Sequence, residues 1–159
     1  MLPGVNARPT SKPIFVVCED GREYIERFQR FLGEGFTFVP AGDFAAALAA
    51  CAGAGAAGLL LDLDFRRTPP DRLVDEAGHP LEVADEGTRR RFSDSQGIYV
   101  LRALRARGVT LPAILFADLA DDQQARFLER TLAPLTVLAS HVGLGEISAL
   151  LARLGAPAT

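Results

Sequence analysis

A short apolar run followed by two acidic residues constrains the fold of this chain more than any other stretch. Gly58–Leu61 contains only glycine and leucine, and Asp62 and Asp64 follow with one leucine between them. Such a run, bounded by turn residues, is typical of a strand buried on both faces of a parallel sheet. Asp62 would then end that strand at its carboxyl end, where open α/β sheets place their ligand crevices. We therefore expect Asp62 to be either a site residue or a cap.

Strand-like and helix-like segments alternate along the rest of the chain. The expected strands are residues 13–17, 36–39, 58–62, 111–117 and 135–139. Helical spacing of apolar residues predicts the helices 24–32, 44–52, 97–107, 121–130 and 144–154. Strict alternation of this kind implies a parallel sheet covered on both faces. The predicted fold class is α/β, a three-layer, doubly wound, five-stranded parallel sheet with five helices.

An insertion interrupts this alternation between the third strand and the third helix. Residues 65–95 form a connection much longer than the usual few residues, and they carry charges of both signs. Within it, residues 73–76 and 81–83 are expected to pair as a small hairpin. We expect its few apolar side chains to cover the rim of the site. Because all five strand-helix units lie outside it, we expect a short linker in its place to leave the fold intact.

The remaining boundaries follow from composition. We expect a disordered segment at 1–12, one domain at 13–155 and a tail at 156–159. The net charge of −3 argues against a nucleic-acid partner, and the sequence contains no membrane-length apolar run. Two cysteines are too few for a disulfide framework, which favours the reducing cytoplasm. The chain ends soon after its last expected helix, so we expect a stand-alone domain.

Several segments, in this order, resemble the receiver domains of response regulators in two-component signalling. The matching segments are residues 14–20, 41–48, 60–62, 100–105 and 111–116. The resemblance implies a flavodoxin-like fold, which agrees with the strand and helix count above. It also implies that a phosphoacceptor aspartate ends the third strand and helps an acidic pair to hold Mg²⁺. Carboxylate oxygens suit this hard cation, which offsets charge during phosphoryl transfer.

The positions implied by the resemblance are only partly filled. Asp62 falls on the phosphoacceptor position, and a weak Mg²⁺ site would draw on Glu19, Asp20, Asp62 and Asp64. In receivers, Thr or Ser ends the fourth strand and Lys ends the fifth. This chain has Ala117 at the first position and Ser140, or Ala139 one residue earlier, at the second. The pattern resembles atypical receivers, or pseudo-receivers, which act through protein contacts without the ordinary phosphorylation switch. The implied partner is a histidine kinase or an output or scaffold protein, with a homodimer as a further arrangement.

Other interpretations of these residues stay open. Asp62 could simply cap the following loop, and Glu19 and Asp20 could be favourable charges at a helix start. Cys18 is either a structural thiol or a reactive one. A metal-free interaction module is a further alternative, and none of these interpretations makes the chain an enzyme.

One rival interpretation is an enzyme. The segment 60–64 resembles the first motif of haloacid-dehalogenase-type phosphatases, in which one aspartate is the nucleophile and the second the acid/base. Asp118 and Asp122 would imitate that family's later metal-binding motif. Against this, Arg66 stands where that family has Thr, and its motif lies on the first strand instead of the third.

Overall fold

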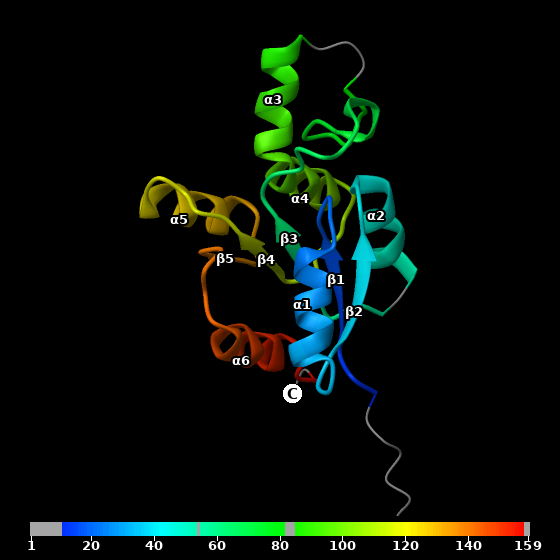
Figure 1. Cartoon of the computed structure of the whole chain (residues 1–159), viewed down its shortest axis with the longest axis vertical. Coiled ribbons are helices and arrows are strands. Elements are labelled where there is room, and N and C mark those ends of the chain that lie inside the picture. Colours follow the sequence, from blue (N-terminus) through cyan, green and yellow to red (C-terminus); the bar gives the residue numbers. More distant parts are fainter. Residues whose placement is uncertain (1–10, 54, 82–84, 158–159) are drawn as a thin grey trace, which may run out of the picture.

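Five parallel strands form one sheet in the order β2-β1-β3-β4-β5 (Figure 1). The computed structural model describes residues 11–53, 55–81 and 85–157. Most of the predicted N-terminal segment and the last two residues of the predicted tail therefore lie outside the described residues. The strands are β1 (Ile14–Cys18), β2 (Thr37–Ala41), β3 (Gly58–Asp62), β4 (Ala113–Phe116) and β5 (Leu135–Leu138).

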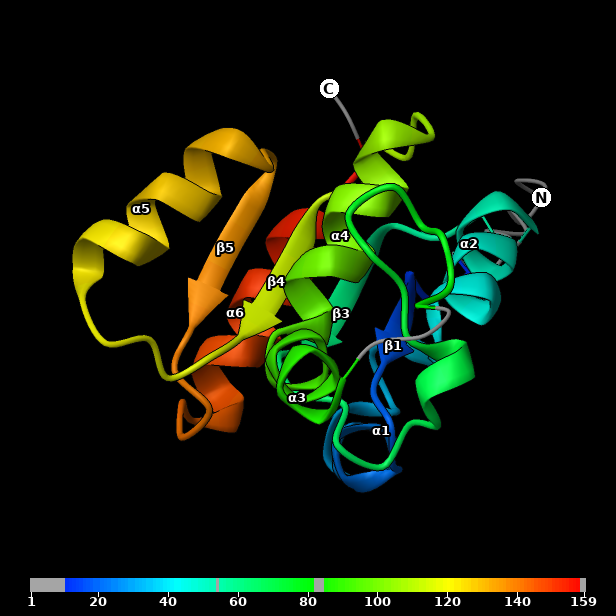
Figure 2. The ribbon, with the colours of Figure 1, turned by 90° about the horizontal axis from the view of Figure 1, so that it is seen from above.

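The central strands are apolar because both of their faces are covered by helices (Figure 2). Along β3, Leu59 and Leu61 enter one core cluster and Leu60 enters the other, as the alternation of a strand requires. One cluster also receives side chains from α2 (Phe44–Gly53), α4 (Gln96–Ala106) and α5 (Asp122–Thr131). The other receives them from α1 (Glu23–Leu32) and α6 (Leu144–Leu154).

The predicted fold class is confirmed, with one correction to the helix count. The described residues contain six α-helices, and the additional one, α3 (Glu86–Asp94), lies inside the insertion. No side chain of α3 is buried, so the helix lacks the apolar stripe that marks the others in the sequence. The carboxylate of Asp85 caps it by accepting a hydrogen bond from the backbone N–H of Thr88 at 2.7 Å.

The insertion is anchored in the core. Phe65, Leu73 and Val74 are each at most 5% exposed and belong to the cluster on the α2–α4 side of the sheet. The predicted hairpin is reduced to one antiparallel bridge between Val74 and Pro80, and residues 82 and 83 of its second arm lie outside the described residues. These side chains are buried in the core, so the expectation that they only cover the rim of the site was wrong. Replacement of the insertion by a short linker would remove Leu73 and Val74 from that core, and its outcome stays a prediction.

A buried glutamine ties the insertion to α4. Gln96 is 1% exposed, and its side-chain amide forms a pair of hydrogen bonds with the backbone of Val74. The Gln96 carbonyl accepts from the Val74 N–H at 2.8 Å, and its amide nitrogen donates to the Val74 C=O at 3.0 Å. The Gln96 amide thus replaces the strand partner that this buried backbone lacks.

Both ends of the insertion lie beside Asp62. The Gly97 N–H donates to the Leu63 C=O at 2.9 Å, and the Phe65 N–H donates to the Ser93 C=O at 2.7 Å. A Cβ atom on Gly97 would collide with the Asp62 carbonyl oxygen. Glycine at the start of α4 therefore allows the helix to approach the end of β3.

Replacement of Gln96 by leucine tests this anchor. Gln96→Leu keeps the side chain's bulk but leaves the buried Val74 N–H and C=O without partners. We expect the free energy of unfolding to fall by about 2 kcal/mol, measured by urea denaturation. Gln123→Leu, on the exposed surface of α5, is the control. Equal changes for the two variants would contradict the role given to Gln96.

Candidate functional site

A cavity of about 530 Å³ opens at the carboxyl ends of β1, β3 and β4. It brings together all four residues predicted as metal ligands, which are Glu19, Asp20, Asp62 and Asp64. The parallel register explains their convergence, because Cys18 pairs with Leu61 and Asp62 pairs with Phe116 across neighbouring strands. The rest of its lining is Glu23, Tyr24, Leu63, Arg66, Arg67, Phe116, Ala117, Asp118 and Ser140.

Asp62 is the last residue of β3 and lies half-buried in this cavity. One carboxylate oxygen accepts a hydrogen bond from the Leu63 N–H at 2.9 Å, so Asp62 does cap the loop that follows. Burial, together with the nearby charge of Asp64, raises the pKa of Asp62 to about 7. Capping and a place in the cavity are thus compatible roles for the same side chain.

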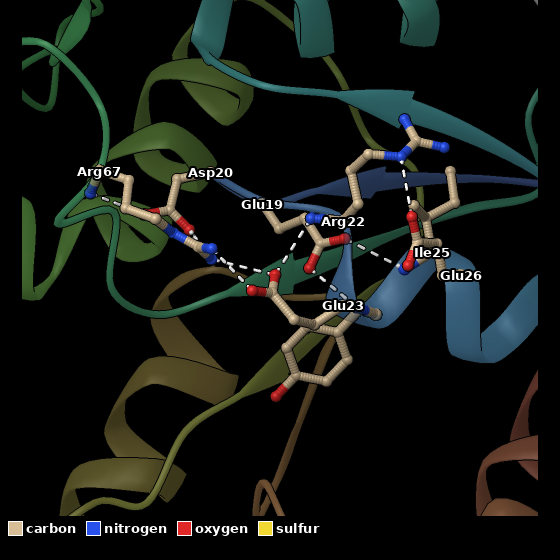
Figure 3. Close-up of polar contacts among 8 residues, drawn as sticks. Glu19, Asp20, Arg22, Glu23, Ile25, Glu26 and Arg67 are labelled. Atoms are coloured by element: carbon tan, nitrogen blue, oxygen red, sulfur yellow. Dashed lines mark hydrogen bonds and ion pairs between the residues drawn. The ribbon is translucent and has the colours of Figure 1, made fainter.

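Glu19 lines the cavity, but its carboxylate is engaged by the start of α1. Its side chain is buried, and its two oxygens accept hydrogen bonds from the N–H groups of Tyr24 and Ile25, both at 3.0 Å (Figure 3). These are N–H groups of the first turn of α1, which have no partner within the helix. Burial raises the pKa of Glu19, and the two N–H groups partly offset that effect. Glu19 therefore acts as the cap of α1.

Asp20 binds Arg67, which comes from the insertion (Figure 3). One Asp20 oxygen accepts from the Arg67 backbone N–H at 2.8 Å, and the other accepts from Nη2 at 3.1 Å. The same guanidinium donates to both oxygens of Glu23, at 2.6 and 3.0 Å. The hydrogen bond from Arg67 lowers the pKa of Glu23 to about 2.

The carboxylates do not form a metal centre as they are arranged. Both oxygens of Glu19 and of Asp20 accept hydrogen bonds from the protein itself. Within the described ranges, no three side chains of the types that bind metals are grouped to hold an ion. Mg²⁺ binds through carboxylate and water oxygens, and the hydrogen bonds on Glu19 and Asp20 would compete with that coordination. The Mg²⁺ site stays a prediction, and Arg67 would have to leave Asp20 before an ion could bind there.

Among the described residues that line the cavity, those at the ends of β4 and β5 include no lysine or arginine, and His141 Nδ1 lies 3.9 Å from an Asp118 oxygen just outside this lining. Ala117 is 6% exposed and supplies only its backbone N–H, which donates to the Leu138 C=O at 2.8 Å. Asp118 accepts hydrogen bonds from the backbone N–H of Ser140, at 3.0 Å, and from its hydroxyl. These hydrogen bonds lower the pKa of Asp118. This wall therefore presents a carboxylate.

Cys18 ends β1 but does not line the cavity. It is fully buried in the core, and burial raises the pKa of its thiol far above the usual value. A thiol that stays protonated is a poor nucleophile and a poor metal ligand. The structural interpretation of Cys18 is therefore the one that its surroundings favour.

No model of a known protein family matches the chain, and no curated protein matches it. Solved structures, in contrast, match the chain over most of its length. The receiver domain of Francisella response regulator 1452 superposes with a TM-score of 0.64 at 14% identity, over 90% of this chain and 96% of that one. A response regulator receiver protein from Pseudomonas putida gives 0.63 at 16% identity, over 90% and 98%. An adenylate cyclase from Rhodopirellula baltica gives 0.60 at 11% identity, over 91% and 87%.

The chain has the receiver fold. This confirms the likeness to receiver domains that the order of the sequence segments indicated. At these identities the comparison establishes the fold alone. Among the helices of the described residues, none has both the length and the apolar character needed to cross a membrane.

The side chains that most affect the cavity were not among the predicted site residues. Arg67 lies 47 residues from Asp20 in the sequence, and Glu23 belongs to the first turn of α1. No local spacing connects them. The one available signal was the Arg66–Arg67 pair, which follows the acidic end of β3 directly.

The raised pKa of Asp62 has a consequence for stability. The pKa of Asp62 is about 7 in the folded protein and 3.8 in the unfolded chain. Between these two pH values the carboxyl group is protonated in the folded state and ionised in the unfolded state. The contribution of Asp62 to the free energy of unfolding therefore falls as the pH rises from about 3.8 to about 7. Asp62→Asn removes this loss while its side-chain oxygen can still accept from the Leu63 N–H.

We expect the melting temperature of Asp62→Asn to exceed that of the unmodified protein at about pH 8, and the difference to shrink toward about pH 5. Differential scanning calorimetry across this range measures it. Asp71→Asn, at an exposed position in the insertion, is the control and should follow the unmodified protein. If the melting temperatures of Asp62→Asn and the unmodified protein change with pH in the same way, the pKa of Asp62 is not raised in the folded protein.

Proposed function

We propose that the chain is a receiver-like signalling domain that acts in the cytoplasm through contacts with a protein partner. In this proposal, phosphorylation at Asp62 does not switch the domain in the ordinary way. The observation that carries the proposal is the Asp118–Ser140 pair, which puts a carboxylate beside the place where receivers have a lysine ammonium group. Ala117 likewise lacks the hydroxyl group that would contact a phosphoryl oxygen.

The charges around Asp62 support this proposal. A phosphoryl group would add about two negative charges to a cavity already lined by Asp64 and Asp118. Phosphoryl transfer depends on cations placed to stabilise that charge. The two arginines that line the cavity are both engaged, Arg66 with Asp94 and Arg67 with Asp20 and Glu23. A phosphoryl group at Asp62 would therefore meet repulsion without a partner to report its presence.

The insertion is the partner-binding element that we favour. In Figure 1, α3 stands beyond the end of the sheet and contacts the body of the domain at its base. There the Phe92 ring packs on Tyr99 of α4 at 4.5 Å between ring centroids. The exposed residues of α3 include Arg90 and Arg91, so the helix offers a basic surface. We propose a histidine kinase or an output or scaffold protein as the partner, with homodimerisation as a further contact.

The phosphatase interpretation has less support in the site. Asp118, which would belong to its metal-binding motif, is hydrogen-bonded to Ser140. The described residues that line the cavity include Asp118 but not Asp122. We therefore propose that the domain is not an enzyme.

Beryllofluoride, which mimics a phosphoryl group on aspartate, tests the proposal. We expect backbone amide shifts in β4, α5, β5 and α6 to stay close to those without it, measured by ¹⁵N–¹H NMR. The physical reason is that neither Ala117 nor Ser140 can bind the added fluorides as a hydroxyl and an ammonium group would.

The double variant Ala117→Thr/Ser140→Lys is the matched comparison. It restores both groups and should respond to beryllofluoride with larger shifts in β4 and β5 than the unmodified protein. Large shifts in the unmodified protein, confined to these same strands and the helices after them, would contradict the proposal.

A further inference from the structure

We propose that Arg67 is the resident cation of the acidic corner, the group formed by Asp20 and Glu23 in the cavity that Glu19 and Asp62 also line. In this role the guanidinium group excludes divalent ions from Asp20 and holds the first turn of the insertion against α1. The inference concerns what neutralises the corner, and it holds whichever partner the domain binds. It also departs from the Mg²⁺ site that the sequence resemblance implies.

The first support is the geometry of the contact. The Arg67 guanidinium spans two carboxylates, with both oxygens of Glu23 accepting at 2.6 and 3.0 Å and one oxygen of Asp20 at 3.1 Å. The Arg67 backbone N–H occupies the second Asp20 oxygen at 2.8 Å. The rigid, planar fork of arginine suits such bidentate pairing, which a single point charge does not achieve.

The second support is burial. The Asp20 side chain is 3% exposed, whereas the Arg67 side chain above it is 58% exposed. A buried carboxylate without a cation or donors is costly, because desolvation is not compensated. Arg67 therefore supplies from the solvent side the charge that Asp20 requires.

The third support is the space around the guanidinium group. A Cβ atom on Gly21 would collide with Arg67 Nη2 and with the Glu23 carboxylate. The residue between Asp20 and α1 thus has no side chain where the guanidinium group lies. This observation is independent of the hydrogen bonds, because it concerns the shape of the site and not its charge.

An internal cation has an advantage over one from solution. Arg67 is held near the corner by Phe65, which is fully buried two residues earlier. Its effective concentration at Asp20 is therefore high, and a divalent ion has to displace it. The same contact fixes the start of the insertion, so loss of Arg67 should both open the corner to ions and loosen that loop.

Arg67→Gln, with Mg²⁺ as the only added ligand, tests the inference. We expect the melting temperature of the unmodified protein to stay unchanged by Mg²⁺ up to about 10 mM. Arg67→Gln should melt lower without the ion and regain stability with it, with Mg²⁺ binding at least about tenfold tighter by isothermal calorimetry. Hydrogen exchange at residues 66–68 should also become faster in the variant.

Arg22→Gln is the matched control, since it removes the same charge nearby but breaks only the exposed pair with Glu26. It should resemble the unmodified protein in its response to Mg²⁺. If Arg67→Gln does not fold, Arg67→Lys keeps the charge but loses the planar fork that spans Asp20 and Glu23, and it should bind Mg²⁺ more tightly than the unmodified protein. Equal Mg²⁺ binding by the unmodified protein and the folded variant would overturn the inference. No phosphoryl mimic or partner is used, so the result is independent of the proposed function.

Discussion

Parallel strands end together at one edge of a sheet, and in this chain that edge gathers carboxylates. Each is accommodated differently. Glu19 accepts hydrogen bonds from two N–H groups in the first turn of α1. Asp20 pairs with the Arg67 guanidinium group, and Asp118 accepts a hydrogen bond from the Ser140 N–H. Asp62 receives one backbone N–H, and its pKa rises to about 7. The need to neutralise or protonate these groups determines the character of the cavity, because close like charges in a half-buried site repel strongly.

The insertion contributes to the charge balance of the cavity because it carries Arg67, which pairs with Asp20. Buried side chains fix the insertion on the core and so fix the position of Arg67. Leu73 and Val74 are buried in the core cluster on the α2–α4 side of the sheet. The side-chain amide of Gln96 accepts from the Val74 N–H and donates to the Val74 C=O. A loop held by buried groups loses little further entropy when Arg67 binds Asp20. The basic helix α3 then projects from an anchored base, which suits a recognition element.

Much of the fold could be predicted from the sequence because short-range patterns determine it. Apolar runs located all five strands to within a few residues, and Asp62 ends β3 as expected. Helix α3 was missed because it buries no side chain and so has no apolar period to detect. The burial of Leu73 and the Asp20–Arg67 contact were also missed, since both depend on long-range packing. The positions of the cavity carboxylates could therefore be predicted from the sequence, whereas the arginine that pairs with Asp20 could not.

The most direct test of this account is a double-mutant cycle between Asp20→Asn and Arg67→Gln, with free energies of unfolding from urea denaturation without added metal. If Arg67 is the cation of the acidic corner, the two changes should not be additive. We expect a coupling free energy clearly larger than the error of additivity, because the Asp20 carboxylate is buried beneath the guanidinium group. Additive effects, within about 0.5 kcal/mol, would show that the two side chains are merely neighbours and would contradict the account.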